Sequence, residues 1–421
     1  MSVLLSIAAM SETNKGGRPY MEDYVAIEFE QDKCGGQGFL AVFDGHGGKD
    51  ASSFACNHLW ENIKRQKDFE SKDPSKVIGA IRQAFRETQN GIWKAVDSWP
   101  SARPGVLSTA GTTVSACVIR GRDLYVGHLG DSGIVLAKKR ADKDKLVARS
   151  LTVDHKPESE SEKNRIESAG GEVRLGNGRV HRVVWNRIRQ PHCGPVLRST
   201  ERESVPFLSV ARSLGDLWSY NYEKGRYVVS PEPDVSFRRI TLETDRFLVF
   251  ASDGLWAVMS HQEAVDFVAR HRRESDDVEE DDENGSRVCS MLVQEGLQRW
   301  KNRSSRADNI SVILAFFHKP KKNAAVKAAT ATEPEPAGET QSLERGISDD
   351  DVVVPPTPPT QDVDVVPPTA TTTTTTSSAQ KRKRKRKSAS KNQKKRKVEL
   401  LSSSSMKKMP ELSNGDVSKL N

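Results

Sequence analysis

A short apolar run that ends in an acidic, glycine-rich turn constrains this chain more than any other stretch. Residues Phe39–Phe43 are apolar throughout, which predicts a strand buried on both faces. Asp44 follows directly, and Gly45-His46-Gly47-Gly48 allows a sharp turn. A carboxylate at a strand end, beside a carbonyl that can turn inward, suits a hard cation such as Mg²⁺ or Mn²⁺. Taken alone, the stretch is better interpreted as an ordinary acidic turn that contains a histidine.

Apolar periodicity predicts a mixed α+β domain over residues 1–318. Further strands are predicted at 3–9, 24–29, 112–119, 124–129, 134–137, 247–251 and 310–317, with a signal-peptide core as the alternative for the first. Helical spacing predicts helices at 51–63, 77–92, 262–270 and 288–300. The acidic run 274–283 is interpreted as a solvated loop. Blocks of strands interrupted by helix pairs predict packed sheets with helices outside.

Charge and cysteine content limit the classes of protein to which the chain can belong. Residues 319–421 contain 20 Lys and Arg against 12 Asp and Glu, a net +8 that equals the net charge of the whole chain. The folded part is therefore neutral, and its active site need not be basic. The five cysteines form no CxxC pair, which indicates a reducing compartment without a disulfide framework or zinc site. No apolar run has the length of a membrane span.

Residues 319–421 differ in character from the rest of the chain. Pro, Thr, Ala and Ser dominate without apolar periodicity, which predicts a disordered basic tail. Two basic clusters, at 381–387 and 394–397, are typical of a bipartite nuclear-import signal that would bind the import machinery. A polybasic segment that contacts nucleic acid or acidic lipid is the alternative. No aromatic residues interleave with the lysines, so base stacking is not indicated.

Carboxylates recur at the ends of predicted strands. They occur in Glu22-Asp23, Asp44-Gly45-His46, Gly130-Asp131-Ser132, Ser252-Asp253-Gly254 and Ala307-Asp308-Asn309. Converging carboxylates repel one another unless cations hold them. Two hard metal ions about 3.5–4 Å apart can activate a water for in-line displacement at phosphorus. Arg18, four residues before Glu22, is suitably placed to bind a phosphate with its planar guanidinium.

Eight short motifs in this order resemble the metal-dependent type 2C Ser/Thr protein phosphatases. They are Arg18 with Met21-Glu22-Asp23, Asp44–Gly48, Ser108 with Gly111–Thr113, Gly130–Ser132, Asp154–Pro157, Ala211–Asp216, Ser252–Trp256 and Ala307–Asn309. The resemblance covers roughly residues 5–318. It implies a four-layer sandwich of two antiparallel β-sheets flanked by helices. Segments such as Asp216–Tyr220 and Val229–Asp234 are similar to the nuclear stress-response branch called Wip, although Glu30–Gly38 is shorter than that branch's usual insertion.

The resemblance also implies roles for individual residues. Direct ligands of a two-metal Mg²⁺ or Mn²⁺ centre would be Asp44, Asp253, Asp308 and the carbonyl of Gly45. Glu22 and Asp23 would lie at the same centre, partly through water, and Asp131 would form a third, weaker site with Asp253. Arg18 would bind phosphate. His46 would protonate the leaving oxygen, or instead only order water.

Several polar residues are given lesser roles. Asp154-His155 is interpreted as a strand-end turn and Asp216 as support for a loop near the metals. His128, inside a predicted strand, is interpreted as a core histidine whose hydrogen bonds are satisfied.

A basic segment over residues 179–202 is the candidate for substrate selection. Arg187, Arg189 and Arg198 belong to it, with almost no acids before Glu201. As a loop beside the metals it would contact a second phosphate or acidic flanking residues. The Wip resemblance implies phospho-Ser/Thr before Gln, and phosphothreonine near phosphotyrosine in stress kinases. The alternative is a solvent-facing loop that only raises encounter rates.

These observations predict a nuclear Ser/Thr phosphatase, and the family resemblance alone implies a monomer. Its partners would be phosphorylated stress kinases and checkpoint proteins, with no membrane and only weak contact with nucleic acid through the tail. A pseudophosphatase scaffold is disfavoured because every expected ligand is present. A nucleic-acid-binding protein and a metal-dependent nuclease are disfavoured because the folded part is neutral.

Overall fold

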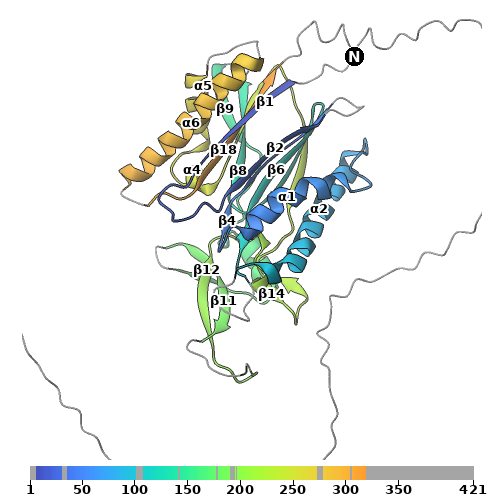
Figure 1. Cartoon of the computed structure of the whole chain (residues 1–421), viewed down its shortest axis with the longest axis vertical. Helices are drawn as coiled ribbons and strands as arrows, with labels where there is room; N and C mark the ends of the chain where they lie inside the picture. Colours follow the sequence, from blue (N-terminus) through green and yellow to red (C-terminus); the bar gives the residue numbers. More distant parts are fainter. Residues whose placement is uncertain are drawn as a thin grey trace, which may run out of the picture. The chain divides into compact units, whose positions relative to one another are not determined.

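The apolar run at 39–43 forms the buried strand that the sequence predicts. A computed structural model describes residues 6–30, 36–100, 108–140, 143–176, 179–189, 195, 197–272, 278–303 and 306–318 (Figure 1). In it, all seven residues of β3 (Gln37–Phe43) are buried. Phe39, Ala41 and Phe43 face one hydrophobic core, and Leu40 and Val42 face another. An apolar run without alternation is what a strand between two apolar layers requires.

Two five-stranded antiparallel sheets form the centre of the described chain. One sheet has the order β16 (Asp234–Arg239), β7 (Asp123–Leu129), β6 (Val114–Arg120), β3, β2 (Tyr24–Glu30). The other has the order β1 (Ser6–Asn14), β18 (Ile310–His318), β17 (Asp245–Ala251), β8 (Gly133–Arg140), β9 (Lys143–Ser150). Leu40, Ile134 and Phe250 belong to the core where residues of the two sheets meet.

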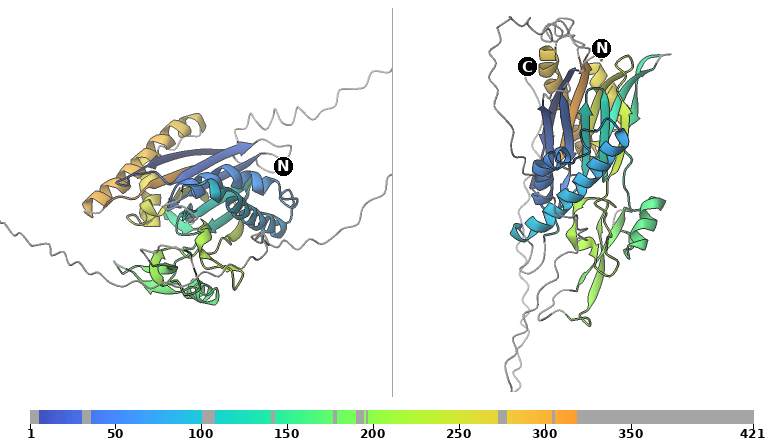
Figure 2. Two further views of the ribbon diagram at one scale, coloured as in Figure 1. Left: turned by 60° about the horizontal axis from the view of Figure 1, so that its bottom comes forward. Right: turned by 90° about the vertical axis from the view of Figure 1, so that its right-hand side faces the viewer.

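Helices cover the outer face of each sheet (Figures 1 and 2). α1 (Asp50–Lys64) and α2 (Pro74–Ala95) share a core with β3, β6 and β7. α4 (Asp253–Trp256), α5 (His261–His271) and α6 (Val278–Asn302) share a core with β17 and β18. Local signals set two of the helix starts: Asp73 caps α2 just before Pro74, and Ser260 forms a capping box with Glu263 in α5. The predicted α+β four-layer sandwich is confirmed.

Smaller elements complete one end of the sheets. β4 (Gly45–His46), β5 (Gly111–Thr112) and β13 (Leu214–Gly215) form a short sheet. β10 (Val173–Leu175), β11 (His181–Ile188) and β12 (Arg202–Leu208) form another, followed along the chain by β14 (Tyr220–Asn221) and β15 (Arg226–Tyr227). α3 (Glu160–Ser168) precedes β10, and two 3₁₀ turns span Val96–Ser98 and Leu217–Ser219.

Three sequence predictions are wrong in detail. The acidic run 274–283 is not a loop throughout, because α6 already begins at Val278; acidic residues are polar, but they are also favoured at the start of a helix. The strand expected at 112–119 is divided, because Gly111–Thr112 pairs with β4 and β6 starts at Val114. The basic segment 179–202 is not a loop throughout, because residues 181–188 form β11 and β12 starts at Arg202.

The remaining sequence predictions concern the tail, the cysteines and membrane spans. Residues 319–421, with both basic clusters, lie outside the described part, as do 274–277. Cys56, Cys117 and Cys289 are free thiols. None of the helices in the described ranges is long and apolar enough to cross a membrane.

Candidate metal centre and phosphate site

Three aspartates from different strand ends come together at one end of the sheets. Asp44 follows β3, Asp131 lies between β7 and β8, and Asp253 begins α4 directly after β17. One carboxylate oxygen of each lies within 4.8 Å of those of the other two. The backbone N–H of Asp253 approaches Asp44 Oδ2 at 3.4 Å. The fold thus brings together acidic side chains that lie far apart in the sequence. These three aspartates are called the acidic group below.

Burial makes this acidic group unfavourable without positive charge. Burial raises the pKa of Asp253 to about 7, and the charges of Asp131 and Asp308 act in the same direction. The pKa of Asp44 is raised well above its ordinary value by burial and by its acidic neighbours. Burial likewise raises the pKa of Asp23 to about 6, against a 2.8 Å hydrogen bond from Ser311. An all-oxygen group of this kind fits hard divalent cations such as Mg²⁺ or Mn²⁺.

Gly45 lets the backbone of β4 lie directly against Glu22. A Cβ atom at this position would stand 2.2 Å from the Glu22 carbonyl oxygen and 2.6 Å from Ser52 Oγ, so no larger residue fits. Glu22 is itself fixed, because its N–H donates to Asn309 Oδ1 at 2.8 Å and its Oε1 accepts from Gly48 N–H at 2.7 Å. Glu22 and Gly45, both of which the sequence analysis assigns to the metal centre, therefore lie against one another.

Arg18 and Asp308 form an ion pair at the rim of the site. Arg18 Nη2 donates to Asp308 Oδ2 at 2.5 Å, and the two side chains are 52% and 32% exposed. The loop before Arg18 is anchored by a hydrogen bond from Gly17 N–H to the Ala307 carbonyl, 3.0 Å long. A guanidinium that is half exposed beside the acidic group can meet an arriving phosphate.

His46 is held by Asp216. The distance from His46 Nε2 to Asp216 Oδ2 is 2.7 Å, and Asp216 also accepts from Trp218 Nε1 at 2.7 Å. Although burial acts to lower the pKa of His46, the Asp216 carboxylate raises it above its ordinary value. The sequence identified Asp216 only as loop support. Its direct contact with His46 was missed because 170 positions separate the two residues.

Lys156 is a further site residue that sequence reasoning missed. Its Nζ donates to Asp131 Oδ2, and Asp131 is only 5% exposed. Asp154-His155 is more than the turn that was predicted, because His155 is buried, accepts from Gly130 N–H at 3.1 Å and contacts Asp234 at 3.1 Å. The segment Asp154–Pro157, already visible as a motif, was the available signal.

His128 is the core residue that the sequence predicted. It is buried, with Ser115 Oγ 3.0 Å from Nδ1 and the Val153 carbonyl 3.2 Å from Nε2.

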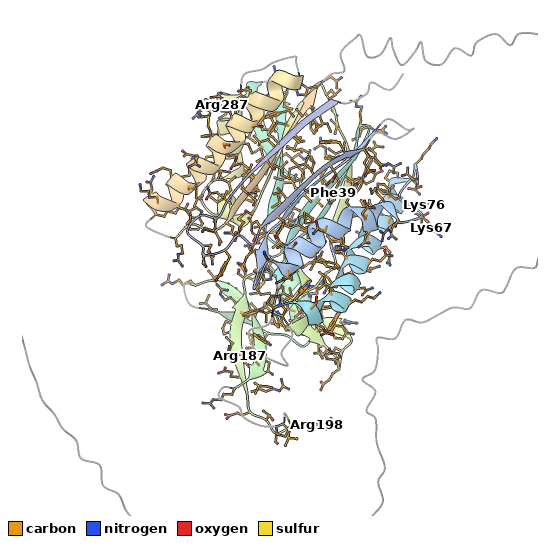
Figure 3. All side chains as sticks on the ribbon, in the orientation of Figure 1. Phe39, Lys67, Lys76, Arg187, Arg198 and Arg287 are labelled. Carbon is orange, nitrogen blue, oxygen red and sulfur yellow. The ribbon has the colours of Figure 1, made fainter. Side chains whose placement is uncertain are left out.

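The basic candidates do not join the acidic group. Figure 3 shows Arg187 and Arg198 along the β11–β12 hairpin, which projects away from the sheet that contains Phe39. Arg187 Nε donates to Glu203 at 2.7 Å, and Arg189 is paired with Glu201. Arg198 is exposed. The basic segment is therefore largely a hairpin rather than a loop, and two of its arginines form ion pairs with Glu203 and Glu201.

Comparisons with known proteins place the chain in a family. The family model described as "Protein phosphatase 2C" matches residues 7–303. "Probable protein phosphatase 2C 58" of Arabidopsis thaliana is 32% identical over 298 residues, covering 71% of this chain and 83% of that protein. "Probable protein phosphatase 2C 42" of Oryza sativa subsp. japonica is 29% identical and covers 77% of this chain and 89% of that protein.

A solved structure shows the same fold. The serine-threonine phosphatase 2C from Toxoplasma gondii aligns with a TM-score of 0.59 at 23% identity, covering 75% of this chain and 98% of that one. The family match stops at residue 303, before Asp308, yet Asp308 reaches the site through its contact with Arg18. With its sequence match over most of the described residues and its shared fold, the chain belongs to the protein phosphatase 2C family of Ser/Thr protein phosphatases.

Proposed function

We propose that this phosphatase hydrolyses phosphoserine and phosphothreonine with the residues gathered at Asp44. The observation that carries the proposal is the convergence of Asp44, Asp131 and Asp253 within 4.8 Å. The half-exposed Arg18, linked to the group through Asp308, adds a phosphate-binding cation. Buried carboxylates that repel one another are stabilised by bound cations, and the exposed guanidinium of Arg18 can bind an anion. A metal-dependent reaction at a phosphate group provides the cations and the anion together.

The metal ions would be held by oxygen ligands alone. Asp44, Asp253, Asp308 and the Gly45 carbonyl are the proposed direct ligands, with Glu22 and Asp23 at the same centre and Asp131 at a third, weaker position. Magnesium or manganese, when bound there, supplies Lewis acidity at phosphorus and an activated water. The remaining work belongs to the chain's own side chains.

Arg18 and His46 divide that work between binding and proton transfer. The Arg18 guanidinium would exchange part of its contact with Asp308 for two oxygens of the phosphoryl group and orient it. Since Asp216 holds His46 at Nε2, a protonated imidazole has Nδ1 left to donate to the departing serine or threonine oxygen. The buried Asp216 carboxylate fixes the orientation and protonation of the ring.

Hydrolysis of a phosphopeptide by the full chain tests this assignment. A phosphoserine-Gln peptide and a generic phosphothreonine peptide would be incubated with Mg²⁺, with Mn²⁺ and with EDTA, alongside Asp253→Ala. Phosphate release that needs a divalent ion and disappears in Asp253→Ala is expected. Release from neither peptide with either metal would reject the catalytic assignment and favour a pseudophosphatase scaffold.

We further propose a nuclear role in stress or DNA-damage signalling, on phosphorylated kinases and checkpoint proteins. The support is the similarity to the Wip branch and the basic clusters at 381–387 and 394–397. Replacing the lysines and arginines of both clusters by alanine should move a fluorescent fusion of the full chain from nucleus to cytoplasm. Unchanged nuclear accumulation would reject the import signal, and salt-sensitive DNA binding lost in the same variant would favour the nucleic-acid alternative.

Substrate selection would fall on the β11–β12 hairpin. Its ion pairs Arg187–Glu203 and Arg189–Glu201 are exposed, and such pairs contribute only about 0–1 kcal/mol, so a substrate phosphate can replace the carboxylates. Arg198, near the end of the hairpin, is exposed as well. Arg198→Ala should reduce turnover of doubly phosphorylated peptides more than that of singly phosphorylated ones, and equal loss on both would reject this selection.

A further inference from the structure

We propose that the open edge of the sandwich between β9 and β16 binds an acidic peptide in extended conformation, as an added strand beside β16. A cavity of about 410 Å³ lies here, lined by the end of β9 and by most of β16. None of its lining residues belongs to the proposed metal centre or phosphate site, so binding here would be separate from the proposed hydrolysis. A site of this kind would bring a partner or substrate protein to the enzyme independently of its phosphate.

The charge of the cavity selects an anionic occupant. Arg149, Arg238 and Arg239 line it, and no lining residue is acidic. Arg149 is exposed, and its side chain has no hydrogen-bond or ion-pair partner within the described residues. Arg238 Nη2 donates to the buried Asp245 at 2.8 Å, but its Nε is buried without a partner among the described groups. Arg239 is paired with Asp123, its Nε lying 2.7 Å from Asp123 Oδ1. Arg149 is therefore the cation of this edge that is left for an anionic occupant, with the unpartnered Nε of Arg238 beside it.

The free backbone edge of β16 favours an occupant in extended conformation. β16 is the outermost strand of its sheet and pairs only with β7 in the described part of the chain. The other bordering strand, β9, is already covered in part: the Gln262 side chain accepts from Ala148 N–H at 3.0 Å and donates to the Leu146 carbonyl at 3.1 Å. β16 therefore offers the free edge, and β-strand addition to such an edge is a recurrent mode of peptide recognition.

The shape of the site favours a peptide over a nucleic acid. The cavity has the volume of a small-molecule pocket, which suits one or two side chains rather than a phosphodiester backbone that follows a long groove. Phe237 is 36% exposed and already lies against Tyr125, with ring centroids 5.0 Å apart, so it offers an apolar contact beside the arginines. Alternating acidic and β-branched residues meet both requirements.

Binding of a labelled peptide to the full chain tests the proposal. The probe is a fluorescein-labelled peptide of alternating Glu and Val, measured by anisotropy in EDTA so that the metal centre takes no part. Its controls are the Gln-Val peptide, the same Glu-Val peptide with a central proline, and oligothymidine of equal charge. The variants are Arg149→Glu, Arg149→Lys and, as a matched exposed cation on α2, Lys76→Glu (Figure 3).

We expect saturable binding of the Glu-Val peptide that Arg149→Glu weakens at least about tenfold, as loss of a charge-assisted contact predicts. Arg149→Lys and Lys76→Glu should remain within about threefold of the unchanged chain, and every variant should hydrolyse p-nitrophenyl phosphate normally in Mg²⁺. Equal binding of the proline-containing peptide would overturn strand addition. Equal binding of oligothymidine, or no effect of Arg149→Glu, would overturn the peptide site. Because binding is measured without metal, these results are independent of whether the catalytic assignment holds.

Discussion

Arg18 is the side chain proposed to bind the substrate phosphate, so replacing it should affect substrate binding more than the later steps of the reaction. Its guanidinium is half exposed and is held in position by Asp308. Arg18→Ala should lower kcat/KM for a phosphopeptide by roughly 10–100-fold, as expected for losing a contact with a charged group, mainly through KM. Arg18→Lys keeps the positive charge but cannot contact two phosphate oxygens with a planar guanidinium. Its kcat/KM should therefore lie between those of Arg18→Ala and the unchanged chain. Steady-state kinetics would check this, and an unchanged KM in Arg18→Ala would contradict it.

Gly111 controls the placement of His46. A Cβ atom there would stand 2.2 Å from Asp216 Oδ2 and 2.4 Å from His46 Nε2, so Gly111→Ala must push the two side chains apart. A shift of about 1 Å at a reacting group can cost about 100-fold in rate, so a loss of that order in kcat is expected.

Gly79→Ala supplies the matched control for Gly111→Ala. Gly79 lies in α2, and a Cβ atom there meets nothing within 4 Å. This variant should keep full activity and gain up to about 1 kcal/mol of stability. Equal kcat in Gly111→Ala and Gly79→Ala would show that the His46–Asp216 contact is irrelevant to turnover.

At the residue scale, the sequence predicted the positions of the aspartates better than it predicted which side chains contact the site residues. Asp44, Asp131 and Asp253 each follow a strand, so their position at the sheet ends could be predicted. The contacts from Lys156 to Asp131 and from Asp216 to His46 depend on how loops from separate parts of the chain come together. Such contacts leave no periodic signal, which is why only a motif marked them.

At the scale of elements, β7 contains a histidine that makes the fold sensitive to acid. Burial, then the neighbouring His155, lowers the pKa of His128 from 6.5 to about 3. In the unfolded chain the same imidazole takes a proton near pH 6.5. Stability is thus complete above pH 6.5 and should fall by about 1.4 kcal/mol per pH unit as the pH drops from 6.5 toward 3.

Urea unfolding at pH 7.5, 6.0 and 5.0 in EDTA would measure this dependence. The carboxyl groups with raised pKa values titrate in the opposite sense, so the comparison must be with His128→Gln, which retains them. The variant should be less stable at pH 7.5 and should lose less stability on acidification. Parallel pH profiles for the two chains would show that His128 does not contribute.

The elements also show where pattern reasoning fails. β3 was predictable because five apolar residues in a row have few alternatives between two sheets. The start of α6 was not, because acidic residues are typical of both loops and helix starts. The hairpin at β11 and β12 was interpreted as a loop because its charged residues hide the alternation, and Glu203 opposite Arg187 becomes visible only once the register is known.

For the molecule as a whole, the acidic group is a source of instability that cations should relieve. Burial and mutual repulsion raise the pKa values of Asp44 and Asp253 in the metal-free chain. Mg²⁺ at about 100 times its dissociation constant should stabilise the fold by about 2.7 kcal/mol, read as a rise in Tm. Asp253→Asn should raise Tm in EDTA by removing one charge and should abolish most of the Mg²⁺ effect. A Tm that Mg²⁺ leaves unchanged at constant ionic strength would contradict this account.

The pairing of β1 with β18 has a consequence for the order of events during synthesis. Ser6–Asn14 lie opposite Ile310–His318 along nine residue pairs, and β18 lies between β1 and β17. Asp308 lies two residues before β18 begins, and it contacts Arg18, which lies four residues after β1 ends. A ribosome must therefore release almost the entire domain before either residue meets the other. A growing chain that has not yet released β18 is therefore expected to have no phosphatase activity. The order of the strands along the chain thus determines when activity first arises.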